Sequence, residues 1–333
     1  MGEKQYGGAS NFGIRKQAKP SKSPVKQVIS EKTKEKLEVE NNISGIENYM
    51  KAGKIAKEVI AYARQIIKPG LALLEIAEKI ENKILALGGK PAFPVNLSIN
   101  DIAAHYTPSH EDKTKASGLL KVDLGVHVEG CIVDTAFSID LENLEESKKL
   151  IEASEKALQE AIKAAKQGAE LWKIGEAIQN TITSFNFSPV RNLSGHELGL
   201  YNIHAGLTIP NCNNNNNTKL PEGAFAIEPF ATKGQGIVYE GKPSGIYRFE
   251  KTAAVRDILS REIQDFIQEE YQTLPFCSRW LVKKFGTRAL LSLSLLEKAQ
   301  ALHQYPQLIE KSHQPVSQAE TTILVTDKVE VLA

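Results

Sequence analysis

Cysteine is scarce in this sequence of 333 residues, and its three cysteines, Cys131, Cys212 and Cys277, are far apart and form no CxxC pair. An odd and scattered set excludes a disulfide framework and is typical of a reducing cytosol. No apolar run approaches the roughly 20 residues of a membrane span, and the polar N-terminus shows no signal peptide. We therefore expect a cytoplasmic protein with no membrane contact.

Net charge is almost absent as well, since 41 Lys and Arg balance 40 Asp and Glu. The balance identifies no polyanionic partner for the chain as a whole. Apolar residues make up 41% of the sequence and charged residues 24%, which suits a chain that buries a core. The length allows one large domain or two ordinary ones.

Composition divides the chain into three zones. Residues 1–40 hold Gly, Ser, Lys and Gln with few large apolar residues, and residues 15–26 carry five bases without an acid. We expect a disordered tail there, either simply solvated or in weak contact with a ribosome or another RNA through phosphates. Residues 41–244 and 311–333 form the predicted main domain, and residues 245–310 a helical insertion between two strand regions.

Helical periodicity and end signals predict two pairs of helices in the main domain. Apolar residues recur at helical spacing before Pro69-Gly70 and again before Gly88-Gly89. A second pair flanks Gly168. The predicted helices cover residues 46–67, 73–87, 144–165 and 173–185, and those of the insertion cover 257–271, 276–285 and 289–302.

A predicted β-hairpin at residues 121–139, KVDLGVHVEGCIVDTAFSI, carries two aspartates in strand-like runs, Asp123 and Asp134. Glu129-Gly130 supplies the turn. If the turn centres near Val128 and Glu129, the aspartates face each other with Cβ atoms roughly 4.5–5.5 Å apart. Two carboxylates that close need a cation, or else they are solvated on an edge hairpin. The hairpin alone leaves both interpretations open.

Three further polar residues lie in apolar or glycine-flanked surroundings. His196 lies in the loop-like stretch 191–206, Glu228 interrupts the apolar run AFAIEPF, and Glu320 precedes ILV. Together with the two aspartates they make four carboxylates and one imidazole, a set that suits two divalent ions such as manganese, iron, cobalt or zinc. His105 also lies beside apolar residues, where a histidine is more often structural.

Five motifs resemble those of the type 2 methionine aminopeptidases: AFPVNLSINDIAAHYTP at 92–108, VDLGVHVEGCIVDTAF at 122–137, SGHELGLYNIHAG at 194–206, AFAIEPFAT at 224–232, and YPQLIE with VSQAETTILV at 305–325. The resemblance covers about residues 43–331. It implies an α/β (α+β) pita-bread fold, in which curved, mostly antiparallel sheets are flanked by helices. It also implies an inserted helical subdomain like a winged helix.

The resemblance further implies an activity and a set of roles. The enzyme would remove the initiator methionine from nascent polypeptides whose second residue is small, using two divalent metal ions (Co, Mn, Fe or Zn). Asp123, Asp134, His196, Glu228 and Glu320 would bind the ions, with Glu228 also handling the proton of the attacking water. His105 and His204 would contact the scissile amide and the oxyanion. Phe93, Ile203 and Tyr305 would form the wall of the methionine pocket.

Two departures accompany the resemblance. Thr321 follows Glu320 where many relatives have a histidine, and we expect the metal site to persist because that histidine is not a ligand. The asparagine run at residues 211–217 is expected to form an exposed loop.

Other functions remain possible from the sequence. One is an X-Pro peptidase of the prolidase type, although no separate N-terminal domain precedes the predicted core. Another is a non-catalytic homologue that associates with ribosomes or RNA, which the five occupied ligand positions disfavour. We expect no specific DNA binding, since Lys283, Lys284 and Arg288 are only a small basic cluster, and we expect a monomer.

Overall fold

The computed structural model describes residues 31–333, with side chains from residue 45 onward. The basic stretch 15–26 and most of the expected tail lie outside this part. Helix α1 (Glu31–Ile66) begins 15 residues before the predicted start at residue 46, so it includes residues 31–40, which we expected in the tail. Residues 43–333 form one compact unit. No helix in the described part has the length and apolar character needed to cross a membrane.

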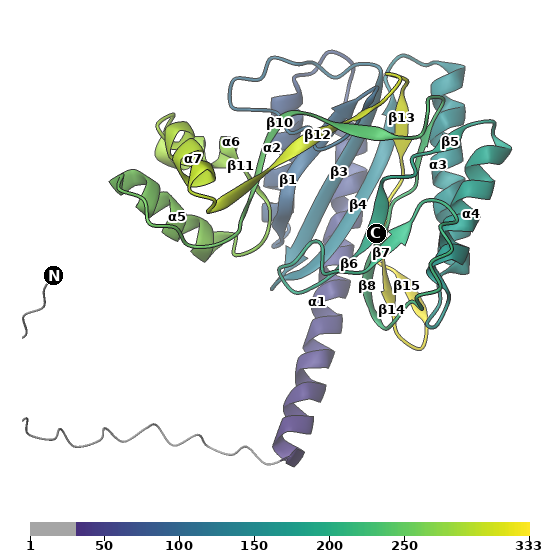
Figure 1. Cartoon of the computed structure of the whole chain (residues 1–333), viewed down its shortest axis with the longest axis horizontal. Coiled ribbons are helices and arrows are strands. Elements are labelled where there is room, and N and C mark those ends of the chain that lie inside the picture. The colour runs from purple at the N-terminus through teal and green to yellow at the C-terminus, as the bar shows by residue number, and fades with distance from the viewer. Residues whose placement is uncertain (1–30) are drawn as a thin grey trace, which may run out of the picture. The chain divides into compact units, whose positions relative to one another are not determined.

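The first half of this unit packs two helices on a three-stranded sheet (Figure 1). Helix α2 (Leu73–Ala86) buries Ile76, Ile80 and Ile84, which recur at helical spacing and so share one face. They join the apolar core beneath strands β1 (Lys90–Ile99), β3 (Leu119–Val128) and β4 (Cys131–Asp140), which pair in the order β1-β3-β4. The hairpin predicted at residues 121–139 is β3 and β4.

The second half repeats this arrangement with other elements. Helices α3 (Glu145–Ala164) and α4 (Leu171–Ser184) pack on a five-stranded sheet of order β15-β14-β8-β6-β7. Small residues of α3 allow close packing against the sheet residues Phe225 and Ile323. The strands are β6 (Ser194–Leu198), β7 (Thr208–Pro210), β8 (Gly223–Ile227), β14 (Thr321–Val325) and β15 (Val329–Val331).

The helices of the predicted insertion occupy a shorter stretch of the chain than residues 245–310. Its helices α5 (Ile258–Glu270), α6 (Ser278–Phe285) and α7 (Ala289–Lys298) share an apolar core of their own. They lie between strands β10 (Val238–Phe249) and β12 (Leu302–Glu310), which pair with each other. The expected bounds 245–310 therefore span the end of β10 and all of β12 as well as these helices. Short strands β11 (Phe276–Cys277) and β2 (Ile102–Ala104) complete this sheet.

A long-range bridge joins the two halves. Glu320 N donates to Ala136 O at 2.9 Å and Ala136 N to Glu320 O at 3.3 Å, which links β4 to the segment before β14. Strands β5 (Ser188–Pro189), β9 (Phe230–Thr232) and β13 (Val316–Gln318) form a small sheet nearby. The expected fold class is confirmed, because helices flank sheets whose described strand pairs are antiparallel.

Candidate metal centre

The hairpin places Asp123 and Asp134 on one face, although not directly opposite each other. The turn is Glu129-Gly130, with positive φ at both residues, 49° and 83°, as a tight two-residue hairpin turn requires. This centre pairs Asp123 with Ala136, and Asp134 with Gly125. Residues of the same parity share a face, so the two aspartates are diagonal neighbours. The predicted shared face is confirmed, and the predicted opposition is wrong by two residues, since Asp123 pairs with Ala136 and not with Asp134.

Three neighbouring strands of the five-stranded sheet bring the other acceptors together. His196 on β6 pairs with Ala226 on β8, and Glu228 follows the last residue of β8. Glu320 directly precedes β14, which pairs with β8 on its other side. Gly195 is needed beside His196, because a Cβ there would lie 2.3 Å from Ala226 O. The sequence had indicated a loop around His196, whereas the structure shows a strand.

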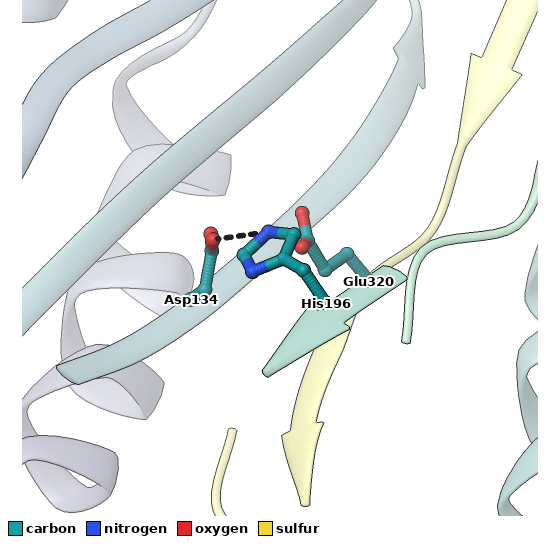
Figure 2. Close-up of side chains that lie close together, drawn as sticks. All are labelled: Asp134, His196 and Glu320. Carbon is teal, nitrogen blue, oxygen red and sulfur yellow. Dashed lines mark ion pairs between the residues drawn. The ribbon is translucent and has the colours of Figure 1, made fainter. Parts of the chain in front are cut away.

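The side chains converge where the two sheets meet (Figure 2). Asp134, His196 and Glu320 each offer a donor atom, and these atoms all lie within 4.8 Å of one another. His196 Nε2 lies 3.6 Å from Asp134 Oδ2 and 3.9 Å from Glu228 Oε1. Asp123 and Glu228 line the same cavity. All five residues named from the sequence as metal ligands therefore face one space.

Two buried carboxylate oxygens of this cluster have no hydrogen-bond partner, as expected for oxygens that bind a cation. Oδ1 of Asp123 and Oδ1 of Asp134 are buried without a hydrogen bond. Burial raises the pKa of Asp123 to about 7. Burial and then the charge of Asp123 raise the pKa of Asp134 well above its usual range. Four anionic groups in one buried space are costly unless they share protons or bind a cation.

The same causes act on the remaining ligand candidates. Burial, followed by the neighbouring aspartates, raises the pKa of Glu228. Burial and then the charges of Asp134 and Glu228 raise the pKa of Glu320, although Gln318 Nε2 donates to Glu320 Oε2 at 3.1 Å. Burial lowers the pKa of His196 to about 3, so its imidazole is neutral, as a metal ligand must be. An oxygen-rich set with one imidazole nitrogen fits divalent ions of the manganese-to-zinc series.

Two further histidines border the cluster. The rings of His204 and His196 are T-shaped at 4.5 Å between centroids, and those of His105 and Tyr305 at 5.5 Å. His105 Nδ1 lies 3.1 Å from Pro306 O, which leaves Nε2 to face the cavity. Burial is the main cause that lowers the pKa of both His105 and His204. The pKa of His204 falls to about 4. Both are therefore neutral at pH 7, and each carries one N–H.

All ten residues named from the sequence line one cavity. Phe93 from β1, Tyr305 from β12 and Ile203 from the loop after β6 contribute to its wall. The carbon atoms of the Phe93 ring occupy the space where a Cβ of Gly125 would lie, 2.3 Å away at the closest. Thr321 is absent from the lining and donates instead to Ala333 O. The histidine-to-threonine departure therefore lies outside this wall.

Sequence reasoning missed four lining residues, Asn96, Ala104, Ile246 and Pro275. Asn96 had a visible signal, because it is the one amide in the apolar strand AFPVNLSI. Ile246 and Pro275 had none, since Ile246 reaches the cavity through the pairing of β10 with β12, and Pro275 directly precedes β11, which pairs with β10. A second cavity adjoins the first and shares with it Ala104, His105, His196, His204 and Glu228.

Fold and site together define a hydrolase built around a metal centre, and comparison with known sequences specifies its family. The chain belongs to the metallopeptidase family M24, which it matches over residues 47–257. It is 47% identical over 285 residues to a methionine aminopeptidase of Pyrococcus abyssi, covering 84% of this chain and 96% of that protein. A methionine aminopeptidase of Methanocaldococcus jannaschii is 43% identical over 288 residues, with 86% and 97% covered.

Solved structures agree on the fold. A thermophilic Arx1 superposes with a TM-score of 0.76 at 18% identity, covering 87% of this chain and 91% of that one. The methionine aminopeptidase of Thermotoga maritima gives 0.63 at 22% identity, with 87% and 96% covered. The prolidase of Pyrococcus furiosus gives 0.54 at 19%. At these identities the likeness concerns the fold alone, which is the expected pita-bread fold.

Proposed function

We propose that this chain removes the first methionine from polypeptides whose second residue is small, using two divalent metal ions. The observation that carries the proposal is the convergence of Asp123, Asp134, His196, Glu228 and Glu320 in one buried cavity. A bound cation would supply the partner that Asp123 Oδ1 and Asp134 Oδ1 lack and would offset the charge of the four carboxylates. Identity of 47% to a methionine aminopeptidase supports the substrate. The X-Pro alternative has support only from the fold.

Divalent ions held by these five residues would generate a nucleophile from water at neutral pH and polarise the scissile carbonyl. Glu228 can take the proton of the attacking water, because its carboxylate lies in the same cavity as the other four ligand candidates and can accept a proton from a water held there. It can then deliver that proton to the nitrogen of the leaving peptide. This is the same cycle of base and acid that one carboxyl group performs in many hydrolases.

The two neutral histidines can make complementary hydrogen bonds: His105 donates its single N–H from Nδ1 to Pro306 O, so its Nε2 can accept from a scissile amide N–H, whereas His204 can donate its N–H. His105 and His204 border the space beside Glu228 in both cavities, so a scissile carbonyl placed there lies within their reach. A neutral N–H donor such as that of His204, aimed at an oxyanion, typically contributes about 3–4 kcal/mol when it is prearranged. Their lowered pKa values keep them uncharged, so they do not repel the cations.

The two adjoining cavities suit a short first residue and a longer remainder. Phe93, Ile203 and Tyr305 give the first cavity an apolar and aromatic wall, which suits the flexible thioether of methionine. The second cavity begins at the shared histidines and is lined by Leu193, Leu207 and Thr208 among others. We assign it to the polypeptide beyond the scissile bond.

The test is hydrolysis by protein reconstituted separately with cobalt, manganese, iron and zinc. We expect rapid release of methionine from Met-Ala-Ser and slow release from a peptide with a large second residue. The control is Asp134→Asn. Cleavage of Xaa-Pro dipeptides with Met-Ala-Ser untouched would establish the X-Pro alternative instead. Absence of hydrolysis with every ion, despite ribosome binding, would favour a non-catalytic protein.

A further inference from the structure

Asn96 occupies a position in the cavity that the proposed chemistry leaves unexplained. It lies on β1, where its cross-strand partner is Asp123, so the two side chains share one face of the sheet. Only 4% of Asn96 is exposed, and it lines the same cavity as the five ligand candidates. Phe93, three residues earlier, lines that cavity too. Asn96 thus belongs to the part of the cavity that would receive the first residue of a substrate.

The hydrogen bonds of Asn96 determine which amide atom is free. Its Nδ2 donates to Pro94 O at 3.1 Å, which fixes the orientation of the amide. Its Oδ1 is buried and has no partner. A buried acceptor without a donor costs about 1–3 kcal/mol, so such atoms in native proteins usually have a partner in the working state. The missing partner must be a donor.

A methionine at the first position of a peptide offers only one kind of donor. Its thioether has no N–H or O–H, and its carbonyl oxygen only accepts hydrogen bonds. The scissile N–H belongs to the second residue. The free α-amino group is therefore the only donor that a first-residue methionine can present to Asn96. The neighbouring oxygens of Asp123 are assigned to the cations, whereas the amide oxygen of Asn96 is neutral and remains available.

From this geometry we infer that Asn96 Oδ1 accepts a hydrogen bond from the free α-amino group of the substrate. The inference rests on the proposed function and adds to it a residue that selects a free N-terminus. A chain that continues before the methionine, or that is acylated, would present at most one N–H and would place further atoms against Asn96. Asn96 therefore contributes to cleavage of the first bond only.

The experiment compares two ligands that differ only in the amine. Calorimetry would measure the affinity of the metal-loaded protein for L-methionine and for 4-(methylthio)butanoate, which lacks the amine. In Asn96→Leu, which keeps the size and removes the acceptor, we expect about a tenfold loss of affinity for methionine. The affinity for the amine-free acid should change less than about twofold, because that ligand never makes the bond. Metal content should equal that of the wild type.

Ser98→Ala is the matched control. Ser98 lies on the same strand, is 2% exposed, and also has a buried hydroxyl without a partner, but it does not line the cavity. We expect this variant to keep the wild-type ratio of the two affinities. Should Asn96→Leu fail to fold, Asn96→Ala makes the same test and should show the same loss of ratio.

Two results would overturn the inference while leaving the proposed function intact. One is an Asn96 variant with an unchanged ratio of affinities; the other is equal weakening of both ligands, as a purely structural role predicts. Failure of the proposed function would appear in the wild type itself, which would then neither bind methionine nor hydrolyse Met-Ala-Ser.

Discussion

Two buried acidic sites in this molecule solve the same problem in opposite ways. Glu81 on α2 is 6% exposed and accepts hydrogen bonds from Arg279 Nη1 and Nη2 at 2.7 and 2.9 Å, from Trp280 Nε1 at 2.9 Å and from Val95 N at 3.2 Å. Asp134 is 4% exposed, yet its Oδ1 has no partner. The chain satisfies the first carboxylate completely and leaves the second one incomplete.

The difference separates a structural charge from one that is held for a ligand. A buried ion pair is stable only when its hydrogen bonds are complete, and Glu81 meets that condition with partners from α6 and β1. Arg279 also donates from Nε to Pro108 O at 3.0 Å, so the pair fixes α6 to the segment that follows His105. The cavity carboxylates instead are buried with one another as neighbours. Burial first, and then for Asp134, Glu228 and Glu320 the neighbouring carboxylates, raises their pKa values and leaves them in need of an external cation.

The largest expected effect comes from removing one of the incomplete carboxylates. Asp134→Asn should lower kcat/KM for Met-Ala-Ser by roughly 10³-fold or more, because a ligand of the metal centre is lost. The metal-free variant should unfold at a temperature no lower than that of the metal-free wild type, since one buried charge is gone. Steady-state kinetics and calorimetric melting check both statements. A marked loss of stability in the metal-free state would place Asp134 with Glu81 as a structural residue.

Breaking the complete pair should have the reverse pattern. Arg279→Met should lower the free energy of unfolding by about 3–5 kcal/mol, because it leaves the Glu81 carboxylate buried without its cation. Urea unfolding measures this change. The double variant Glu81→Leu with Arg279→Met serves as the control and should recover most of the loss. If Arg279→Met alone cost under about 1 kcal/mol, the contrast between the two sites would fail.

The pH dependence of the metal-free protein should expose the incomplete site. Its carboxyl pKa values are raised in the folded state, that of Asp123 to about 7, so these carboxyl groups bind more protons in the folded protein than in the unfolded chain. These groups should therefore stabilise the fold fully below about pH 4 and lose that contribution as the pH rises through about 7, by up to about 1.4 kcal/mol per unit for each carboxyl group, against an opposite trend below about pH 6.5 from the buried neutral His196 and His204. Chelated protein unfolded in urea at several pH values tests this. The metal-loaded protein should lack the decline.

Lys121 is a buried cationic side chain that can be compared with the two acidic sites. We expect its effect on stability to be the smallest of those predicted. It is 1% exposed, and its Nζ donates to Asn100 O at 2.8 Å and to Val316 O at 2.9 Å, with no carboxylate in contact. Burial lowers its pKa to about 7, below the unfolded value. The unfolded chain then binds more protons above pH 7, so stability should rise from about pH 7 to 10, by at most about 1.4 kcal/mol per unit.

The measurement is the same denaturation series at alkaline pH on metal-loaded protein. Lys121→Met should remove the rise, because it removes the group that titrates. If the stability of Lys121→Met rose with pH as in the wild type, another titrating group would be responsible for the rise.

The helices and the hairpin that depend on local sequence signals could be predicted from the sequence. Helices α2 and α3 begin and end within two residues of the predicted bounds, because apolar spacing and glycine punctuation are local signals. The hairpin was identified by its alternation and by Glu129-Gly130. Its pairing was misplaced by two residues, since the register depends on φ at the turn residues, which the alternation does not specify.

The residues of the site also differ in whether a local signal in the sequence could predict their position. Asp123 and Asp134 could be paired from one hairpin, whereas His196, Glu228 and Glu320 were grouped with them only by residue type and apolar surroundings, and their individual roles came from the family resemblance. Their convergence depends on β8 lying between β6 and β14, and on the bridge from β4 to Glu320. No periodicity in the sequence encodes such pairings. Asn96 was passed over because a single amide in an apolar strand has no meaning until its neighbours are known.

The bridge between β4 and Glu320 has a consequence for the order of folding. Thr135 Oγ1 donates to Glu320 O at 2.9 Å across 185 positions of sequence, so this contact closes one of the longest loops in the chain. Contacts between residues so far apart in the sequence form late, because the chain must lose the entropy of closing the loop before the contact can stabilise it. We expect metal loading to follow this closure. A chain that has formed only its first half would hold two aspartates and no hydrolytic centre, so activity appears only in the finished fold.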